Sequence, residues 1–63
     1  MSLKGRMLVV EDDLSQRELL AGFLRDLGAE VDEAGSGTEA IEKLSVSHPD
    51  FVITDVRMPH LDG

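Results

Sequence analysis

The chain contains no cysteine, no tryptophan and no tyrosine, and only two of its 63 residues are phenylalanine. Without cysteine it forms neither disulfides nor thiolate metal sites, so we expect a reducing, cytoplasmic location. Because aromatic side chains are almost absent, a surface on which nucleic-acid bases stack is not expected.

Basic residues are also scarce, since six Lys and Arg stand against thirteen Asp and Glu, for a net charge of −7. This balance argues against direct nucleic-acid binding, which needs positive charge facing the phosphate backbone. No apolar run approaches the ~18 residues of a membrane span, and no secretory signal pattern is present. We therefore expect neither nucleic acid nor membrane as a partner of this small chain.

Hydrophobic periodicity divides the chain into alternating strands and helices. Short continuous apolar runs indicate strands buried on both faces, and a polar stretch with weak alternation indicates an edge strand. The predicted strands are 7–10, 29–34 (the polar one) and 51–54, and the predicted helices are 14–27 and 38–45. Asp13 or Ser15 is expected to cap the first helix. Ser36 or Thr38 is expected to cap the second, and Gly28 to end the first in a left-handed conformation.

Apolar stripes predict which side of each helix faces the sheet. The stripes are Leu19, Leu20, Phe23, Leu24 and Leu27 in the first helix, and Ala40, Ile41 and Leu44 in the second. The charged residues of the first helix are expected to form a solvated face; they are Arg17, Glu18, Arg25 and Asp26.

The β-α-β-α-β order predicts an α/β fold with one parallel sheet, because each helix forms a right-handed crossover. We expect the strand order 2-1-3, which makes the first and third strands neighbours in half of a doubly wound sheet. Two helices cover three parallel strands poorly, whereas such sheets are normally covered on both faces. The apolar third strand is then exposed, and we expect a piece of a larger domain, or a chain that self-associates to hide this surface.

Acidic residues follow the two strands predicted to be neighbours. Glu11, Asp12 and Asp13 come after the first strand, and Asp55 comes after the third. With the order 2-1-3, these strand ends meet at a topological switch point, where ligands bind. Close carboxylates repel unless they share a proton or a cation, and Mg²⁺ prefers oxygen ligands. Glu11, Asp12 and Asp55 are therefore candidate Mg²⁺ ligands, and Asp55 is also the candidate nucleophile for a phosphoryl group.

These residues resemble the motifs of a known family. Segment 8–13, LVVEDD, and segment 48–63, HPDFVITDVRMPHLDG, are similar to the first-strand and third-strand regions of the receiver domains of two-component response regulators. The resemblance implies a flavodoxin-like fold in which Asp55 accepts a phosphoryl group from a sensor histidine kinase. It also implies that Glu11, Asp12 and the backbone carbonyl of Arg57 bind Mg²⁺ with Asp55, in phosphorelay signalling rather than turnover catalysis.

The resemblance is to the first half of that family. Receiver domains continue with further strands, which carry a Ser or Thr, an aromatic residue and a Lys that have no counterpart here. The domain is therefore expected to span residues 1–63 and to stop after the third strand and its loop. On that basis, the acidic pocket should form only in part, and switching of an output partner should need the remainder of the domain.

Two alternatives remain open. Gly35, Gly37 and Ala40 fit the G-x-G-x-x-A pattern of a dinucleotide-binding turn, and Asp55 lies about 20 residues further on, where a ribose-binding acid is wanted. The strand before this turn is acidic, however, which is unfavourable for a pyrophosphate. The second alternative is an inert structural half-domain. A phosphatase of the haloacid dehalogenase type is disfavoured, because Arg57 stands where that family has a second Asp.

Overall fold

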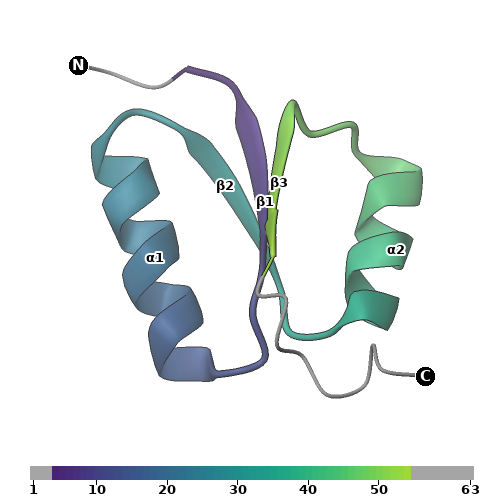
Figure 1. The fold of residues 1–63 in the computed structure, drawn as a ribbon. Coiled ribbons are helices and arrows are strands. Elements are labelled where there is room, and N and C mark those ends of the chain that lie inside the picture. The colour runs from purple at the N-terminus through teal and green to yellow at the C-terminus, as the bar shows by residue number, and fades with distance from the viewer. Residues whose placement is uncertain (1–3, 55–63) are drawn as a thin grey trace.

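The computed structural model describes residues 4–54, which form a sheet with one helix on each face (Figure 1). The elements are β1 (Arg6–Val10), α1 (Leu14–Asp26), β2 (Glu30–Ala34), α2 (Gly37–Val46) and β3 (Phe51–Thr54). Every predicted element is confirmed, with ends that differ by one residue at most. Neither helix in this part of the chain is long and apolar enough to cross a membrane.

The sheet is parallel and has the order β2-β1-β3, as predicted. β1 is the central strand, and its last residue, Val10, pairs with Ala34 of β2 and with Thr54 of β3. The polar strand β2 lies at an edge, also as predicted. The carboxyl ends of the strands and the amino ends of both helices meet at the lower end of the molecule in Figure 1.

α1 begins and ends with locally encoded motifs. The Asp13 side chain caps it by accepting a hydrogen bond from the backbone N–H three residues later, at 3.0 Å. At the other end, Gly28 has φ +101° and donates its N–H to the Arg25 carbonyl at 2.9 Å. The Ala29 N–H donates to the Leu24 carbonyl at 3.2 Å. This pair of bonds is a Schellman motif, and it confirms the left-handed conformation predicted for Gly28.

A reciprocal exchange of hydrogen bonds begins α2. Ser36 is the N-cap, and its Oγ accepts the N–H of Glu39 at 3.1 Å. The Glu39 side chain reaches back, and its Oε1 accepts the N–H of Gly35 at 2.8 Å. The arrangement resembles a capping box moved back by one residue, and it holds the turn between β2 and α2 against the helix end.

The core has two halves, one on each face of the sheet, and β1 contributes to both because its side chains alternate. The half under α2 comprises Leu8, Val10, Ala34 and Ala40, and the half under α1 comprises Met7, Val9, Leu24 and Ala29. Val9 has 0% of its surface exposed and Leu8 has 2%. The central strand is therefore the most deeply buried element among the described residues.

The predicted helix stripes are only partly correct. Leu19 is 77% exposed and Phe23 is 60% exposed, whereas Ala21, which was not in the stripe, is fully buried beside Leu24. Ile41 of α2 is likewise exposed. Each helix packs mainly over β2 and β1 and makes no extensive contact with β3, so part of each apolar stripe is left uncovered.

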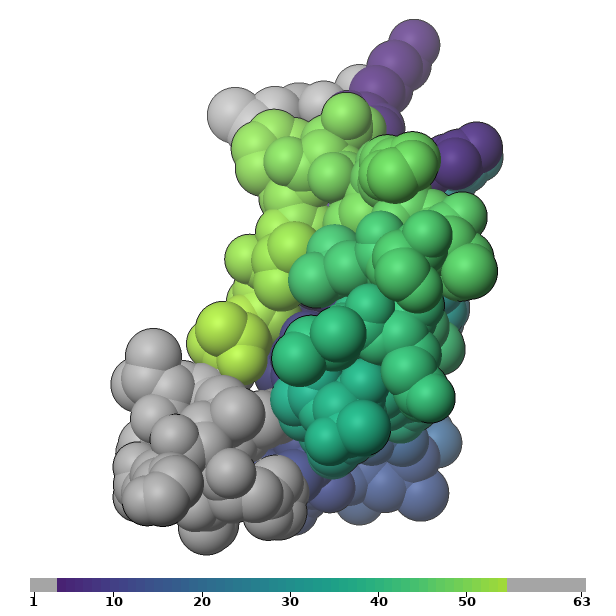
Figure 2. Space-filling view, turned by 90° about the vertical axis from the view of Figure 1, so that its right-hand side faces the viewer, coloured from purple at the N-terminus to yellow at the C-terminus, as the bar shows by residue number. Residues whose placement is uncertain are grey.

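β3 was predicted to be buried on both faces, and within residues 4–54 it is not. Phe51 and Val52 lie on opposite faces of the strand, and both are exposed. Neither helix makes extensive contact with β3. Figure 2 shows this strand at the surface beside α2. The expectation of an uncovered third strand is therefore confirmed for this part of the chain.

Candidate functional site

The predicted acidic site lies at the carboxyl ends of β1 and β3. These strands are hydrogen-bonded neighbours, and Val10 and Thr54 pair at their ends. In the sequence, Glu11 follows Val10 directly and Asp55 follows Thr54 directly. Asp55 and Arg57 themselves lie outside the described residues, so the structure places the β1 side of the predicted site and the strand end that precedes Asp55.

Hydrogen bonds hold Glu11 at its N–H, at its carboxylate and at its carbonyl. Its N–H donates to the Ala34 carbonyl at 3.0 Å, which extends the β1–β2 ladder past the end of β1. Its carboxylate Oε2 accepts the N–H of Asp13 at 3.1 Å, and its carbonyl accepts Nη1 of Arg17 at 3.0 Å. Glu11 is 9% exposed, the only charged residue buried in the part of the chain that the structure describes. Its carboxylate is therefore fixed in orientation before any ligand arrives.

The other two acids of this turn differ in their roles. Asp13 is engaged as the cap of α1, which accounts for that carboxylate by local structure alone. Asp12 is exposed, and it makes no hydrogen bond or ion pair with residues 4–54. The Asp12 carboxylate is thus available to a ligand, as far as residues 4–54 are concerned.

Arg17 contacts the acidic turn, a role that the sequence analysis missed. It was assigned to the solvated face of α1, but only 19% of its side chain is exposed. Besides its bond to the Glu11 carbonyl, it places Nε 3.4 Å from Glu33 Oε1, an ion pair in which Nε lacks good hydrogen-bond geometry. Helix periodicity carries no signal for this contact, because Glu33 reaches Arg17 only through the pairing of β2 with β1.

A second group of charges ties α2 to β2. Lys43 Nζ donates to Asp32 Oδ1 at 3.0 Å and to the Glu33 carbonyl. It also lies 3.6 Å from Glu39 Oε2. The hydrogen bond from Lys43 lowers the pKa of Asp32, and the same bond raises the pKa of Lys43. The pKa of Glu39 is lowered chiefly by the hydrogen bond from the Gly35 N–H. These contacts anchor α2 rather than forming part of the acidic turn.

The donor atoms of Glu11 and Asp12 suit Mg²⁺. Both supply carboxylate oxygens, and Mg²⁺ in proteins typically takes one or two carboxylates, with waters and phosphate oxygens completing an octahedron. Residues 4–54 contain no group of three or more His, Cys, Asp or Glu side chains that could hold a metal. The described residues therefore fit Mg²⁺ as one part of a site, which Asp55 and Arg57 would have to complete.

Comparison with known proteins identifies the family. The sequence profile described as "Response regulator receiver domain" matches residues 7–63 of this chain. The chain belongs to the response regulator receiver domain family. The parallel β2-β1-β3 sheet with a helix on each face agrees with the first half of the flavodoxin-like fold expected for such a receiver domain.

Relatives of this receiver chain include sensor and regulatory proteins. It is 46% identical over 60 residues to Sensor protein EvgS of Escherichia coli K12, covering 95% of this chain and 5% of EvgS. It is 49% identical over 59 residues to Transcriptional regulatory protein PdtaR of Mycobacterium tuberculosis H37Rv, covering 92% and 29%. It is 45% identical over 58 residues to Response regulator MprA of Mycobacterium sp. strain KMS, covering 92% and 25%. The chain thus spans less than a third of each relative. No solved structure matches it significantly.

The receiver chain fills the turn after β2 with its own side chains. The N–H of Gly35, which a dinucleotide phosphate would need, donates to Glu39 instead. A Cβ on Gly35 would lie 2.8 Å from Arg17 Nη1, so the guanidinium occupies the space beside this glycine. Gly37 is the first residue of α2. These glycines serve packing and capping, and together with the family match this leaves the dinucleotide alternative without support.

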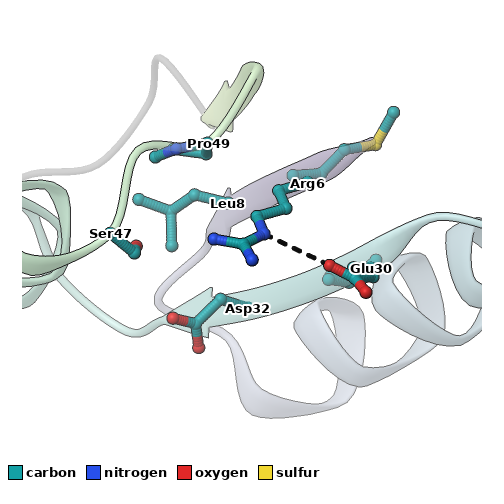
Figure 3. Close-up of a pocket in the computed structure, with 8 residues that line it drawn as sticks. Arg6, Leu8, Glu30, Asp32, Ser47 and Pro49 are labelled. Carbon is teal, nitrogen blue, oxygen red and sulfur yellow. Dashed lines mark hydrogen bonds and ion pairs between the residues drawn. The ribbon is translucent and has the colours of Figure 1, made fainter. Parts of the chain in front are cut away.

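Surface hollows of the receiver chain lie at both ends of the sheet. One of about 180 Å³ is at the amino ends of the strands, away from the acids, and Figure 3 shows it. There Arg6 and Glu30 pair with each other at 3.3 Å, and both side chains are exposed. Another, of about 600 Å³, runs beside α1 and is lined by Glu11, Leu20 and Phe23 among others. Of these two hollows, the second reaches the acidic turn, at Glu11.

Proposed function

We propose that the chain accepts a phosphoryl group on Asp55, at a site where Glu11, Asp12, Asp55 and the backbone carbonyl of Arg57 bind Mg²⁺. The observation that carries the proposal is the parallel pairing of β1 with β3 up to their last residues. Consecutive Cα atoms are ~3.8 Å apart, so the residues that directly follow paired strand ends start from neighbouring positions. Acids on both sides of such a junction favour a shared cation.

The chemistry that suits this arrangement is phosphoryl transfer to a carboxylate. A carboxylate oxygen of Asp55 attacks phosphorus while the bond from phosphorus to the imidazole nitrogen of a phosphohistidine donor breaks, and the nitrogen keeps the electron pair. Mg²⁺, when bound, supplies the positive charge that offsets repulsion between the phosphoryl oxygens and the acids. Glu11 contributes a carboxylate of fixed orientation, and Asp12 contributes an exposed one.

We infer that the donor is a sensor histidine kinase and that transfer takes place in the cytoplasm as a step of a phosphorelay. Support comes from the family match and from relatives named as a sensor protein and a response regulator. The acyl phosphate formed on Asp55 is itself the signal, so the domain acts as a stoichiometric acceptor and not as a turnover enzyme.

Labelling of the intact protein tests the acceptor assignment. Incubated with acetyl phosphate and Mg²⁺, the wild type should gain one phosphoryl group by intact mass, and Asp55→Asn should gain none. Asp50→Asn is the matched control, because Asp50 lies at the opposite end of β3 and Asn can still accept the hydrogen bond from the Arg6 N–H. Equal labelling of the wild type and Asp55→Asn would contradict the proposal. A wild type that is never labelled would favour the inert structural half-domain.

Calorimetric titration with Mg²⁺ tests the ligand assignment within the acidic turn. Asp12→Asn should weaken binding by more than roughly tenfold, because even a residue outside the ligand set often costs that much. Asp13→Asn should leave the affinity unchanged, since Asn caps a helix about as well as Asp. An equal loss in both variants would show that only the total charge of the turn matters.

A further inference from the structure

We propose that Arg17 is a positioning residue for the metal site: it holds the turn after β1 so that Glu11 and Asp12 are presented toward the end of β3. This inference rests on the proposed function and adds a residue that touches neither the metal nor the phosphoryl group. It accounts for a half-buried arginine and for a glycine turn that the acceptor chemistry leaves unexplained.

The contact with the Glu11 carbonyl is the first support. Beyond Val10 the chain leaves the sheet, and the Glu11 N–H to Ala34 bond is the last rung on the β2 side. Arg17 Nη1 then binds the Glu11 carbonyl at 3.0 Å from the first turns of α1. The peptide that joins Glu11 to Asp12 is thereby tied to the helix, and with it the direction in which both acids leave the backbone.

The planar fork of the guanidinium is the second support. Nη1 binds Glu11, while Nε on another edge of the same rigid plane faces Glu33 Oε1 at 3.4 Å. An arginine held at two edges has a fixed orientation, which a lysine cannot reproduce. Glu33 also offsets the positive charge of Arg17, which would otherwise oppose the binding of a cation at the acidic turn. Arg17 can therefore hold the acidic turn without adding an unpaired cation to it.

Gly35 is the third support, because its lack of a side chain makes room for Arg17. A Cβ there would lie 2.8 Å from Nη1. The backbone does not require glycine at this position, since the glycines with positive φ in the described residues are Gly5 and Gly28. Gly35→Ala should therefore fold normally and displace the guanidinium end of the Arg17 side chain from the Glu11 carbonyl, with its charge intact.

Arg25 provides a matched control on the same helix. It pairs with the other oxygen of the same carboxylate, Glu33 Oε2, at 3.2 Å. Its remaining hydrogen bond goes to the Val31 carbonyl rather than to the acidic turn. A variant at Arg25 thus removes one positive charge and one Glu33 partner while leaving Glu11 untouched.

The experiment compares Arg17→Gln, Gly35→Ala and Arg25→Gln in the intact protein. Mg²⁺ affinity is measured by calorimetry, and the amide chemical shifts of Asp12 and Asp13 are recorded without metal. We expect roughly tenfold weaker Mg²⁺ binding in Arg17→Gln and in Gly35→Ala, the size typical of residues that orient ligands. The amide shifts should move in the same two variants. Arg25→Gln should bind Mg²⁺ like the wild type, whatever its thermal stability.

The outcomes separate this inference from the function on which it rests. Wild-type affinity in both Arg17→Gln and Gly35→Ala would overturn the positioning role and leave the proposed function standing. An equal loss of Mg²⁺ affinity in Arg25→Gln would also overturn the positioning role, because the weaker binding would then follow from the lost charge or from lower stability. A wild type that binds no Mg²⁺ would overturn the proposed function itself. Should Arg17→Gln not fold, Gly35→Ala alone decides.

Discussion

Lys43 and Asp32 join α2 to the edge strand β2 through a hydrogen bond of 3.0 Å, and each shifts the pKa of the other. The pKa of Asp32 lies below its ordinary value of 3.8, so this contact stabilises the fold at pH above that value and the contribution disappears as the pH falls through the lowered pKa. The pKa of Lys43 lies above 10.5, so its contribution is complete below that pH and is lost as the pH rises through the raised pKa. The free energy of unfolding, measured by urea denaturation at a series of pH values, should contain the full contribution of this contact between pH 3.8 and pH 10.5.

Replacing Lys43 should change the pKa values of Asp32 and Glu39, the two carboxylates that it contacts, by different amounts. In Lys43→Gln the pKa of Asp32 should rise toward its ordinary value, because the hydrogen bond from Lys43 is the largest cause of its shift. The pKa of Glu39 should change less, since the Gly35 N–H is the main cause there. Carboxyl ¹³C titration by NMR reads both groups, and Lys4→Gln is a charge-matched control at an exposed residue. Shifts of equal size at the two carboxylates would contradict the assignment of causes.

Substitution by alanine should change the free energy of unfolding in opposite directions at two glycines of the α1 region. Gly22 lies inside α1, and a Cβ there would meet nothing within 4 Å, so Gly22→Ala should stabilise the fold by about 0.5–1 kcal/mol. Gly28 has φ +101° at the end of the same helix, and Gly28→Ala should destabilise it by roughly 1 kcal/mol or more. Urea denaturation of both variants measures the difference, and changes of the same sign would refute the conformational argument.

Self-association through β3 stays a prediction for the 63-residue chain. Val52 lies exposed on this strand, and uncovered apolar edge strands are prone to pair with other chains. Sedimentation velocity should show a concentration-dependent oligomer, and Val52→Lys should shift it toward monomer. Ser45→Lys on the exposed surface of α2 adds the same charge and should have no effect. A monomer at all concentrations would rule the prediction out.

Local rules were sufficient to predict the elements and the caps. Asp13, Ser36 and Gly28 act within a few residues of themselves, so their roles can be read without tertiary structure. The polarity of β2 predicted its place at an edge, whereas β3 is apolar and lies at the other edge of the sheet. The position of Glu11 and Asp12 at a strand end beside β3 followed in turn, whereas the roles of Asp55 and Arg57 stay predictions.

Two features could not be predicted from the sequence, the exposure of apolar residues on α1 and the contacts of Arg17, because both depend on how the helices are placed across the sheet. Leu19 and Phe23 share the apolar stripe of α1, but the helix is placed over β2 and β1 and leaves them uncovered. Arg17 looked like a surface residue because its partners, Glu33 and the Glu11 carbonyl, come from two strands that meet only in the folded chain. Periodicity describes the faces of one helix and holds no information about the register of its neighbours.

The burial of β1 has a consequence for how the acidic turn behaves during partial unfolding. An edge strand can detach while β1 keeps its ladder with the remaining neighbour, whereas freeing β1 disrupts both ladders and both halves of the core. Backbone amides around Val9 should therefore exchange with solvent only through the largest opening events. Glu11 and Asp12 directly follow the segment that resists such fluctuations longest, so the backbone from which they leave the sheet is the last to open.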